Sequence, residues 1–219
     1  MEPSTFNGRV VIVSGGSLGS WILDLIQEGD RIIGADAGAL FLVRHGIKPH
    51  LSLGDFDSVS PEEQKDIRAE SLESASFDPV DKNYTDTELA FRRGLDLKPS
   101  SILLLGATGS RLDHTLANVH LLRLSAEQGI PAAIEDAANR IRVLPPGSSM
   151  ALGRSRFEHI SLLPLSMRVA GINLAGFQYP LTDASLEIGQ SLGISNALAA
   201  ESGTVSSAEG WLLVIESIG

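Results

Sequence analysis

Cysteine is absent from the 219-residue sequence. Its absence excludes disulfides and thiolate metal sites, so any metal must be bound by oxygen or histidine. Basic residues are few, with 17 lysines and arginines against 27 aspartates and glutamates, and the net charge is −10. Nucleic-acid-binding proteins usually present a basic face to the phosphates, so this composition predicts no such partner. A small cationic ligand, by contrast, would be attracted by the acidic field.

Long hydrophobic runs are also missing. No segment approaches the roughly 18 uninterrupted apolar residues of a membrane-spanning helix. The N-terminal sequence MEPSTFNGR lacks the basic start and the apolar block of a signal peptide. We therefore expect no membrane association and a cytoplasmic location. With 43% hydrophobic and 20% charged residues, the composition is that of an ordinary globular protein.

The first 137 residues alternate short β-rich runs with helical patterns, which predicts an α/β domain with a mostly parallel sheet and helices on both faces. Ligands of such domains bind beyond the carboxyl ends of the strands. The predicted strands end on SGG, GADAG, GDFD and GATG, so glycine and aspartate gather where a site is expected. The expected strands are residues 9–15, 31–36, 50–55, 74–77, 101–107 and 131–136.

The sequence changes character near residues 137–140. From there to the C-terminus, short apolar runs are separated by Gly, Pro, Asn and Ser, with little helical periodicity. This pattern is typical of an antiparallel β domain, a sandwich or a small barrel. We therefore predict an α/β domain over residues 1–137 and an all-β sandwich over residues 138–219.

The segment LGDFDSVS, residues 53–60, ends a predicted strand on two aspartates. Alternate residues of a strand point the same way, so Asp55 and Asp57 can face one cavity while Phe56 packs inward. Converging carboxylates suit Mg²⁺, which prefers oxygen ligands. Alternatively, Asp57 begins an Asx turn. Ser60, followed by Pro61 and Glu63, predicts a helix cap under either reading.

Two further segments place polar residues at helix starts. In DKNYTDTELAF, residues 81–91, Thr85 and Glu88 form a capping-box pattern, and Asp86 lies in a first turn. In GATGSRLDHTLANVHLL, residues 106–122, a Gly-rich loop before a helix is typical of phosphate binding. Arg111 is then a candidate phosphate clamp, because its planar fork matches phosphate oxygens. Asp113 has the alternative role of N-cap.

Other patterns are weaker. The glycines of SGGSLGS, residues 14–20, miss the G-x-G-x-x-G spacing of a dinucleotide fold, and no Gly-Lys pair provides a Walker A loop. On the helix after GATG, His114 and Asn118 are four residues apart and share a face. In the β domain, Ser195 and Asn196 can present polar groups to a heteroaromatic ligand, although Ser-Asn pairs are also common in turns.

Taken together and in order, these segments resemble the thiamine pyrophosphokinase family. The resemblance rests on DAGALFLVRHGIKPHLSLGDFDSVS, TDTELA, GATGSRLDHTLANVHLL, VAGINLAGFQYPL and SLGISN, from about residue 34 to the C-terminus. It implies transfer of the pyrophosphoryl group of ATP to the hydroxyl of thiamine, with Mg²⁺ as cofactor and AMP as by-product. It also implies an α/β catalytic, ATP-binding domain, a β-sandwich that binds thiamine, and a homodimer with sites at the subunit interface.

The resemblance also implies roles for individual residues. The acidic residues at Mg²⁺ and the reaction centre would be Asp55, Asp57 and Asp86, with Asp36 and Asp81 as neighbours. The nucleotide region would contain Thr85, Arg111, Asp113, His114 and Asn118, and the thiamine pocket Ser195 and Asn196. The division between metal ligand and general base among the aspartates stays open.

Two positions depart from the family pattern. Asn83 stands where members often have a second aspartate, and Ser110 stands where they often have a second glycine. Asn83 leaves one charge fewer near the metal, and Ser110 makes the loop less permissive. The alternatives to the thiamine enzyme are a related diphosphokinase acting on another hydroxymethyl heterocycle, such as a pterin, and an inactive module that binds thiamine or nucleotide.

Overall fold

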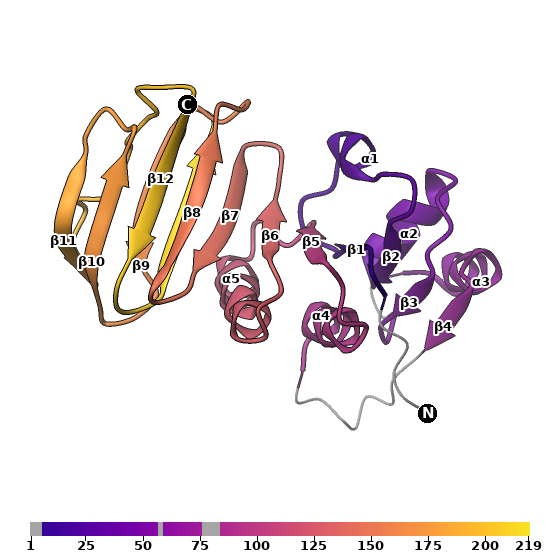
Figure 1. Ribbon diagram of the computed structural model, residues 1–219. Coiled ribbons are helices and arrows are strands. Elements are labelled where there is room, and N and C mark those ends of the chain that lie inside the picture. Colours follow the sequence, from indigo (N-terminus) through magenta and orange to yellow (C-terminus); the bar gives the residue numbers. More distant parts are fainter. Residues whose placement is uncertain (1–5, 57–58, 76–83) are drawn as a thin grey trace. The chain divides into compact units, whose positions relative to one another are not determined.

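The computed structural model describes residues 6–56, 59–75 and 84–219. The chain divides into two compact units, Met1–Ala137 and Ala138–Gly219. Their secondary structure agrees with the two predicted classes, an α/β unit followed by an all-β unit (Figure 1). No helix among the described residues is both long and apolar enough to cross a membrane.

The described residues of the first unit form six parallel strands and five helices, with one helix in each interval between successive strands. Its strands pair in the order β4-β3-β2-β1-β5-β6. The order reverses between β1 and β5, and this switch point is where open α/β sheets bind ligands. The elements are β1 (Arg9–Val13), α1 (Trp21–Leu25), β2 (Arg31–Ala35), α2 (Ala37–Arg44), β3 (Leu51–Leu53), α3 (Pro61–Glu70), β4 (Glu73–Ala75), α4 (Asp86–Asp96), β5 (Ser101–Leu105), α5 (Leu112–Glu127) and β6 (Ala132–Glu135).

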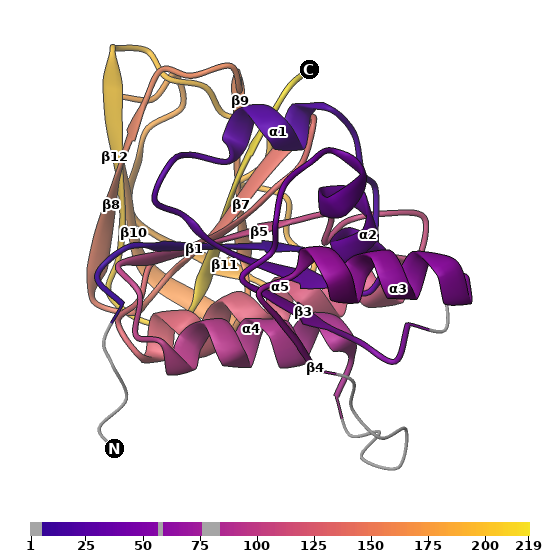
Figure 2. The ribbon, with the colours of Figure 1, turned by 90° about the vertical axis from the view of Figure 1, so that its right-hand side faces the viewer.

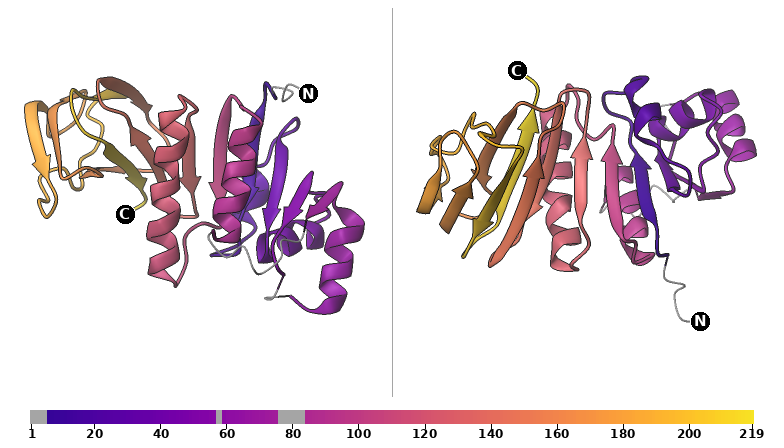
Figure 3. Two further views of the ribbon diagram at one scale, coloured as in Figure 1. Left: turned by 90° about the horizontal axis from the view of Figure 1, so that it is seen from below. Right: turned by 45° about the horizontal axis from the view of Figure 1, so that its top comes forward.

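Helices cover both faces of this sheet, as predicted. Successive side chains of each strand point to opposite faces, so strands that are apolar over consecutive residues bury apolar side chains on both sides of the sheet. Val11 and Val13 pack in one buried cluster with Ile22 of α1 and Leu42 of α2. On the other face α4 contacts β1, β2, β3 and α5. Figure 2 shows α1 and the pair α4 and α5 on opposite sides of the strands, and Figure 3 shows α4 and α5 side by side.

The predicted cap at Ser60 is present in full. Its hydroxyl accepts from the backbone N–H of Glu63, the Glu63 carboxylate accepts from the backbone N–H of Ser60, and Pro61 is the first helical residue. The second predicted box is only half formed. Thr85 accepts from the backbone N–H of Glu88, but the Glu88 carboxylate turns to Arg92 four residues later, 2.9 Å from its Nε. Both caps begin their helices where the sequence predicts.

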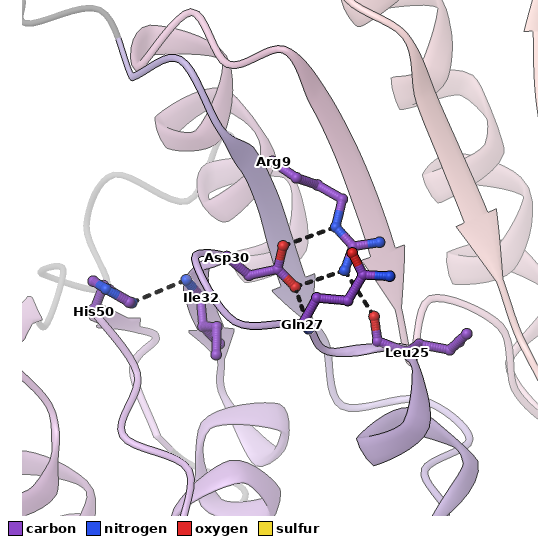
Figure 4. A network of polar contacts seen from close by, with 6 residues as sticks. All are labelled: Arg9, Leu25, Gln27, Asp30, Ile32 and His50. Atoms are coloured by element: carbon purple, nitrogen blue, oxygen red, sulfur yellow. Dashed lines mark hydrogen bonds and ion pairs between the residues drawn. The ribbon is translucent and has the colours of Figure 1, made fainter.

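A polar network holds the amino ends of three strands together (Figure 4). Arg9 at the start of β1 donates from Nε and Nη2 to both carboxylate oxygens of Asp30, at 2.9 and 2.6 Å, and from Nη2 to Leu25 O at 2.8 Å. His50 Nδ1, just before β3, accepts from the Ile32 N–H of β2 at 3.1 Å. These contacts lie at the end of the sheet opposite to the carboxyl ends, so they support the site only through the strands.

The second unit is a β-sandwich, which confirms that prediction. One layer has the order β7-β13-β9 and the other β11-β10-β12-β8, with antiparallel neighbours in both. Residues of both layers, among them Leu162, Val169, Val205 and Val214, share one buried core. The strands are β7 (Asn139–Leu144), β8 (Ser148–Gly153), β9 (His159–Pro164), β10 (Arg168–Ala175), β11 (Leu181–Glu187), β12 (Ser202–Ser207) and β13 (Leu212–Ser217).

Candidate active site

A cavity of about 770 Å³ lies at the switch point of the first unit. Segments that follow the carboxyl ends of β1, β2, β3 and β5, together with the starts of α4 and α5, provide its lining. Polar groups from distant parts of the chain therefore meet in one place, as the strand-end sequences predict. The lining residues that the sequence singles out are Asp36, Asp55, Thr85, Asp86, Arg111, His114 and Asn118.

Asp55 faces the cavity and Phe56 packs inward, as the sequence predicts, but the alternation of side chains along a strand is not the cause. Strand β3 ends at Leu53, so both residues lie in a loop and not on the strand. Asp55 is exposed and lines the cavity, whereas Phe56 is 3% exposed and packs with Leu40 and Ile67. Phe56 adopts φ 56°, in the left-handed region that residues other than glycine seldom occupy.

Asp36 follows β2 and precedes the first residue of α2. Its backbone has φ 49° and ψ −124°, which is unfavourable for a residue other than glycine. The Asp36 N–H donates to Leu53 O at 2.9 Å and so ties the end of β2 to the end of β3. This contact holds Asp36 and Asp55 at neighbouring strand ends, on the same cavity.

Asp57 and Asp81 fall outside the described residues, as does Asn83. Among the residues that are described, no group of three or more acidic or histidine side chains is close enough to hold a metal ion. The carboxylates of Asp36, Asp55 and Asp86 nevertheless line one cavity, and they are hard oxygen donors. Mg²⁺ is commonly bound by one or two carboxylates together with substrate phosphates and water, so this donor set fits it.

Two glycine-containing loops lie against each other beside the cavity. Backbone N–H groups of the SGGS segment after β1 donate to the carbonyls of the GATG segment after β5. The distances are 2.8 Å from Gly16 N to Gly106 O and 2.7 Å from Ser17 N to Thr108 O. A Cβ on Gly16 would lie 2.3 Å from Thr108 O, so only glycine permits this approach. The loose dinucleotide-like pattern of this segment therefore reflects loop packing.

Helix α5 holds the GATG loop in place. Asn118 is buried, and its Nδ2 donates to Ala107 O at 2.8 Å. The Gly109 N–H donates to Thr115 Oγ1 at 3.2 Å. This N–H of the predicted phosphate loop is thus bonded within the protein, and Asn118 supports the loop directly.

Arg111 lines the cavity, and Asp113 holds its guanidinium. Arg111 Nη2 donates to Asp113 Oδ2 at 2.7 Å and Nε donates to Oδ1 at 3.3 Å. This hydrogen bond lowers the pKa of Asp113 and raises the pKa of Arg111. Helix α5 begins at Leu112, so Asp113 lies in its first turn and is not the N-cap. His114, with a 45% exposed side chain, also lines the cavity.

Several lining residues could not be identified from the sequence. Among them, Ser14, Ser17, Thr108 and Thr115 carry hydroxyls. Tyr84, which the sequence leaves open between packing and binding, also lines the cavity, and the guanidinium of Arg92 lies 4.8 Å from the centroid of its ring. The available signal was the position of these residues at strand ends and helix starts. Serine and threonine are too common in loops for that signal to single them out.

In the second unit, Asn196 is 6% exposed, and its side-chain amide makes three hydrogen bonds to backbone groups. Its Nδ2 donates to Tyr179 O at 2.7 Å, and its Oδ1 accepts from Tyr179 N at 3.1 Å and from Ala197 N at 2.9 Å. Ser195 is exposed, with φ 58°, and its N–H donates to Ser161 Oγ. The two residues therefore differ in their surroundings. The buried Asn196 amide holds the backbone of the loop, whereas Ser195 is exposed to solvent.

Comparisons with known proteins agree with the fold. Residues 22–134 match the family model "Thiamin pyrophosphokinase, catalytic domain", and residues 150–212 match "Thiamin pyrophosphokinase, vitamin B1 binding domain". The thiamine pyrophosphokinase of Bacillus subtilis is 35% identical over 185 residues, which cover 84% of this chain and 86% of the relative.

Solved structures give the same result. The crystal structure of the Bacillus subtilis enzyme superposes with a TM-score of 0.88 at 32% identity, covering 95% of this chain and 98% of that one. The thiamin pyrophosphokinase of Geobacillus thermodenitrificans superposes with a TM-score of 0.87 at 33% identity, covering 96% and 98%. The resemblance recognised in the sequence is therefore confirmed, and the chain belongs to the thiamin pyrophosphokinase family.

Proposed function

We propose that this protein transfers the pyrophosphoryl group of ATP to the hydroxyl of thiamine, giving thiamine diphosphate and AMP. The observation that carries the proposal is the cavity at the switch point, which brings Asp36, Asp55 and Asp86 together with Arg111. Acidic groups suit a metal-bound triphosphate and the fixed positive charge of thiamine, and an arginine suits phosphate oxygens. The α/β unit is then the catalytic, ATP-binding domain, and the sandwich is the thiamine-binding domain.

Mg²⁺ is the cofactor that the donor set favours. Asp55, Asp57 and Asp86 are the proposed ligands, with Asp36 and Asp81 beside them. The ion would neutralise charge on the β- and γ-phosphates when bound. Because magnesium sites are often completed by substrate phosphates, binding of the ion together with ATP needs no preformed cluster of three carboxylates.

The reaction requires one new bond and one broken bond. The thiamine hydroxyl oxygen attacks the β-phosphorus, the bond from that phosphorus to the oxygen bridging to the α-phosphorus breaks, and AMP leaves. The hydroxyl proton passes to a carboxylate, and Asp57 and Asp86 are the candidates. Arg111 binds phosphate oxygens, while Thr85, Asp113, His114 and Asn118 complete the nucleotide region, so positioning and electrostatics supply most of the acceleration.

Ser195 and Asn196 are the proposed thiamine contacts of the sandwich, Ser195 through its exposed hydroxyl and Asn196 through the loop that it holds. We also propose a homodimer with sites at the subunit interface, as the resemblance to the family implies. Exposed apolar side chains near this loop support an interface there, since Tyr179 is 68% and Leu192 63% exposed. Light scattering after size exclusion measures the oligomeric state. The cytoplasmic location stays a prediction.

The test is direct. Purified protein is incubated with Mg²⁺, ATP and thiamine, and AMP and thiamine diphosphate are separated by chromatography. Formation of both in equal amounts is the expected result, and no AMP, beside an active control enzyme, would refute the proposal. Binding of both ligands without turnover would identify an inactive binding module.

Single carboxamide variants test the acidic groups. Asp57→Asn and Asp86→Asn keep the size of the side chain and remove the charge. We expect kcat to fall at least about a hundredfold in each, because charge neutralisation and proton transfer each contribute on that scale. Retention of the circular dichroism spectrum controls for folding. Wild-type kcat in the Asp57→Asn variant would contradict its assignment.

A further inference from the structure

Helix α4 carries Asp86 as its first residue and has one buried stripe. The buried residues are Thr87, Ala90, Phe91, Gly94 and Leu95. Gly94 allows a close approach to the sheet, because a Cβ there would lie 3.3 Å from side-chain atoms of both Val10 and Ile12 of β1. Thr87, seven residues earlier on the same face, is the stripe's polar residue and lies at the end that lines the cavity.

The partner of Thr87 is Ser14, the residue that follows β1. Ser14 Oγ and Thr87 Oγ1 are 2.5 Å apart, although the residues are 73 positions apart in the sequence. Ser14 is 6% and Thr87 7% exposed, and both line the cavity. The Ser14 N–H also donates to Leu105 O of β5 at 2.8 Å. The hydroxyl pair thus connects the start of α4 to the two strands that flank the switch point.

We infer that Ser14 and Thr87 are positioning residues for the reaction, and this inference rests on the proposed function. Asp86 precedes Thr87 in the first turn of α4, so the hydroxyl pair sets the distance of this carboxylate from the SGGS loop. Both residues act through Asp86 and the loop. A displacement of about 1 Å at a reacting group can cost a hundredfold in rate, so a bond of this kind affects turnover more than affinity.

A purely structural role makes a different prediction. Removing one of two buried hydroxyls leaves the other without its partner and destabilises the fold, whereas replacing both with apolar groups is nearly neutral. The double variant Ser14→Ala/Thr87→Val therefore keeps the packing and removes the bond. If the pair served stability alone, this variant would turn over like the wild type.

The experiment compares Thr87→Val, Thr87→Ser, the double variant and the wild type in steady-state kinetics and thermal unfolding. For the double variant we expect kcat to fall about tenfold or more, a KM for thiamine within about twofold of wild type, and a Tm within about 4 °C. Thr87→Ser keeps the hydroxyl and should recover most of kcat. A double variant with wild-type kcat would overturn the inference.

Ser71→Ala is the matched control. Ser71 Oγ pairs with Ser52 Oγ at 2.7 Å, also between residues distant in sequence, but neither residue is among the described lining of the cavity. This variant should lower Tm and leave kcat unchanged. An equal loss of kcat in Ser71→Ala and Thr87→Val would show that any lost hydroxyl pair has this effect, and would also overturn the inference.

A binding measurement separates this inference from the proposed function. Calorimetry with Mg²⁺ and a nonhydrolysable ATP analogue reports the site without turnover. If the wild type makes no AMP but binds the analogue, the proposed function fails, and the inference then requires at least about threefold weaker binding by the double variant. Equal binding would overturn it. A wild type that neither turns over nor binds the analogue would refute both.

Discussion

The Arg111 guanidinium, which lines the cavity, donates to the Asp113 carboxylate at 2.7 Å, two residues further along the chain. Both side chains are largely exposed, at 69% and 65%. The hydrogen bond lowers the pKa of Asp113, because it favours the charged carboxylate over the protonated form. Asp113 therefore orients the guanidinium before any phosphate binds.

Replacing Arg111 with alanine is expected to raise the KM for ATP about tenfold, the effect of one lost charge-assisted phosphate contact. Arg111→Lys should recover only part of the loss, because an ammonium group lacks the planar fork. Initial rates over a range of ATP concentrations at saturating thiamine measure this. Arg123→Ala is the control, since Arg123 pairs with Glu127 and is not among the described lining residues. An unchanged KM in Arg111→Ala would remove Arg111 from the nucleotide site.

Gly16 marks the contact between the two loops beside the cavity. Alanine at this position would place a Cβ 2.3 Å from Thr108 O and 2.5 Å from Gly106 O, and both are backbone atoms. We expect Gly16→Ala to lower the free energy of unfolding by about 2 kcal/mol through overpacking and to weaken ATP binding. Urea unfolding measures the stability. Gly153→Ala, where a Cβ meets nothing within 4 Å, should change little. Equal stability of the two variants would disprove this account of the loops.

His50 makes stability depend on pH. Burial, and secondly the charge of Arg31, lower the pKa of His50, whose Nδ1 accepts from the Ile32 N–H. The unfolded chain therefore binds the proton at higher pH than the folded protein does. Stability should fall as pH drops from about 6.5, the pKa of an unfolded histidine, towards the lower folded value.

The variant His50→Asn isolates this effect, because asparagine offers an acceptor to Ile32 and does not titrate. Urea unfolding between about pH 8 and pH 5 should give a flatter stability curve for the variant than for the wild type. The other four histidines are common to both proteins. Parallel curves would mean that His50 does not cause the pH dependence.

Asn196 and its neighbour Ser195 should respond differently to alanine. Asn196→Ala removes three hydrogen bonds to the backbone of Tyr179 and Ala197 from a buried site. We expect it to lower the free energy of unfolding by about 2 to 3 kcal/mol. Ser195→Ala should leave stability unchanged and raise the KM for thiamine. The two quantities are measured by denaturant unfolding and by kinetics at saturating ATP. Wild-type stability of Asn196→Ala would contradict its role in the loop.

Features with a local cause could be predicted from the sequence. Six strands, the helices between them and the cap at Ser60 follow from hydrophobic periodicity and from the short-range chemistry of Ser, Pro and Glu. Near residue 138 the helical periodicity gives way to short apolar runs separated by Gly, Pro, Asn and Ser, and this change likewise predicts the β-sandwich. Parallel strands bring their carboxyl ends to the same edge of a sheet. One cavity at that edge is therefore lined by Asp36, Asp55, Asp86 and Arg111.

Only the tertiary structure decided which hydroxyls, amides and glycines serve the site. The bond between Ser14 and Thr87, the amide of Asn118 on Ala107 and the tight approach of Gly16 to Thr108 each join segments from different parts of the chain. Such pairs have no periodicity in the sequence, because they arise from strand order and from the close packing of one loop on another. The sequence by itself determined the family, the two folds and the acidic strand ends, because each depends on residues that are close together in the sequence or on a characteristic motif. The partner of each polar side chain depends on which segments folding brings within hydrogen-bond distance.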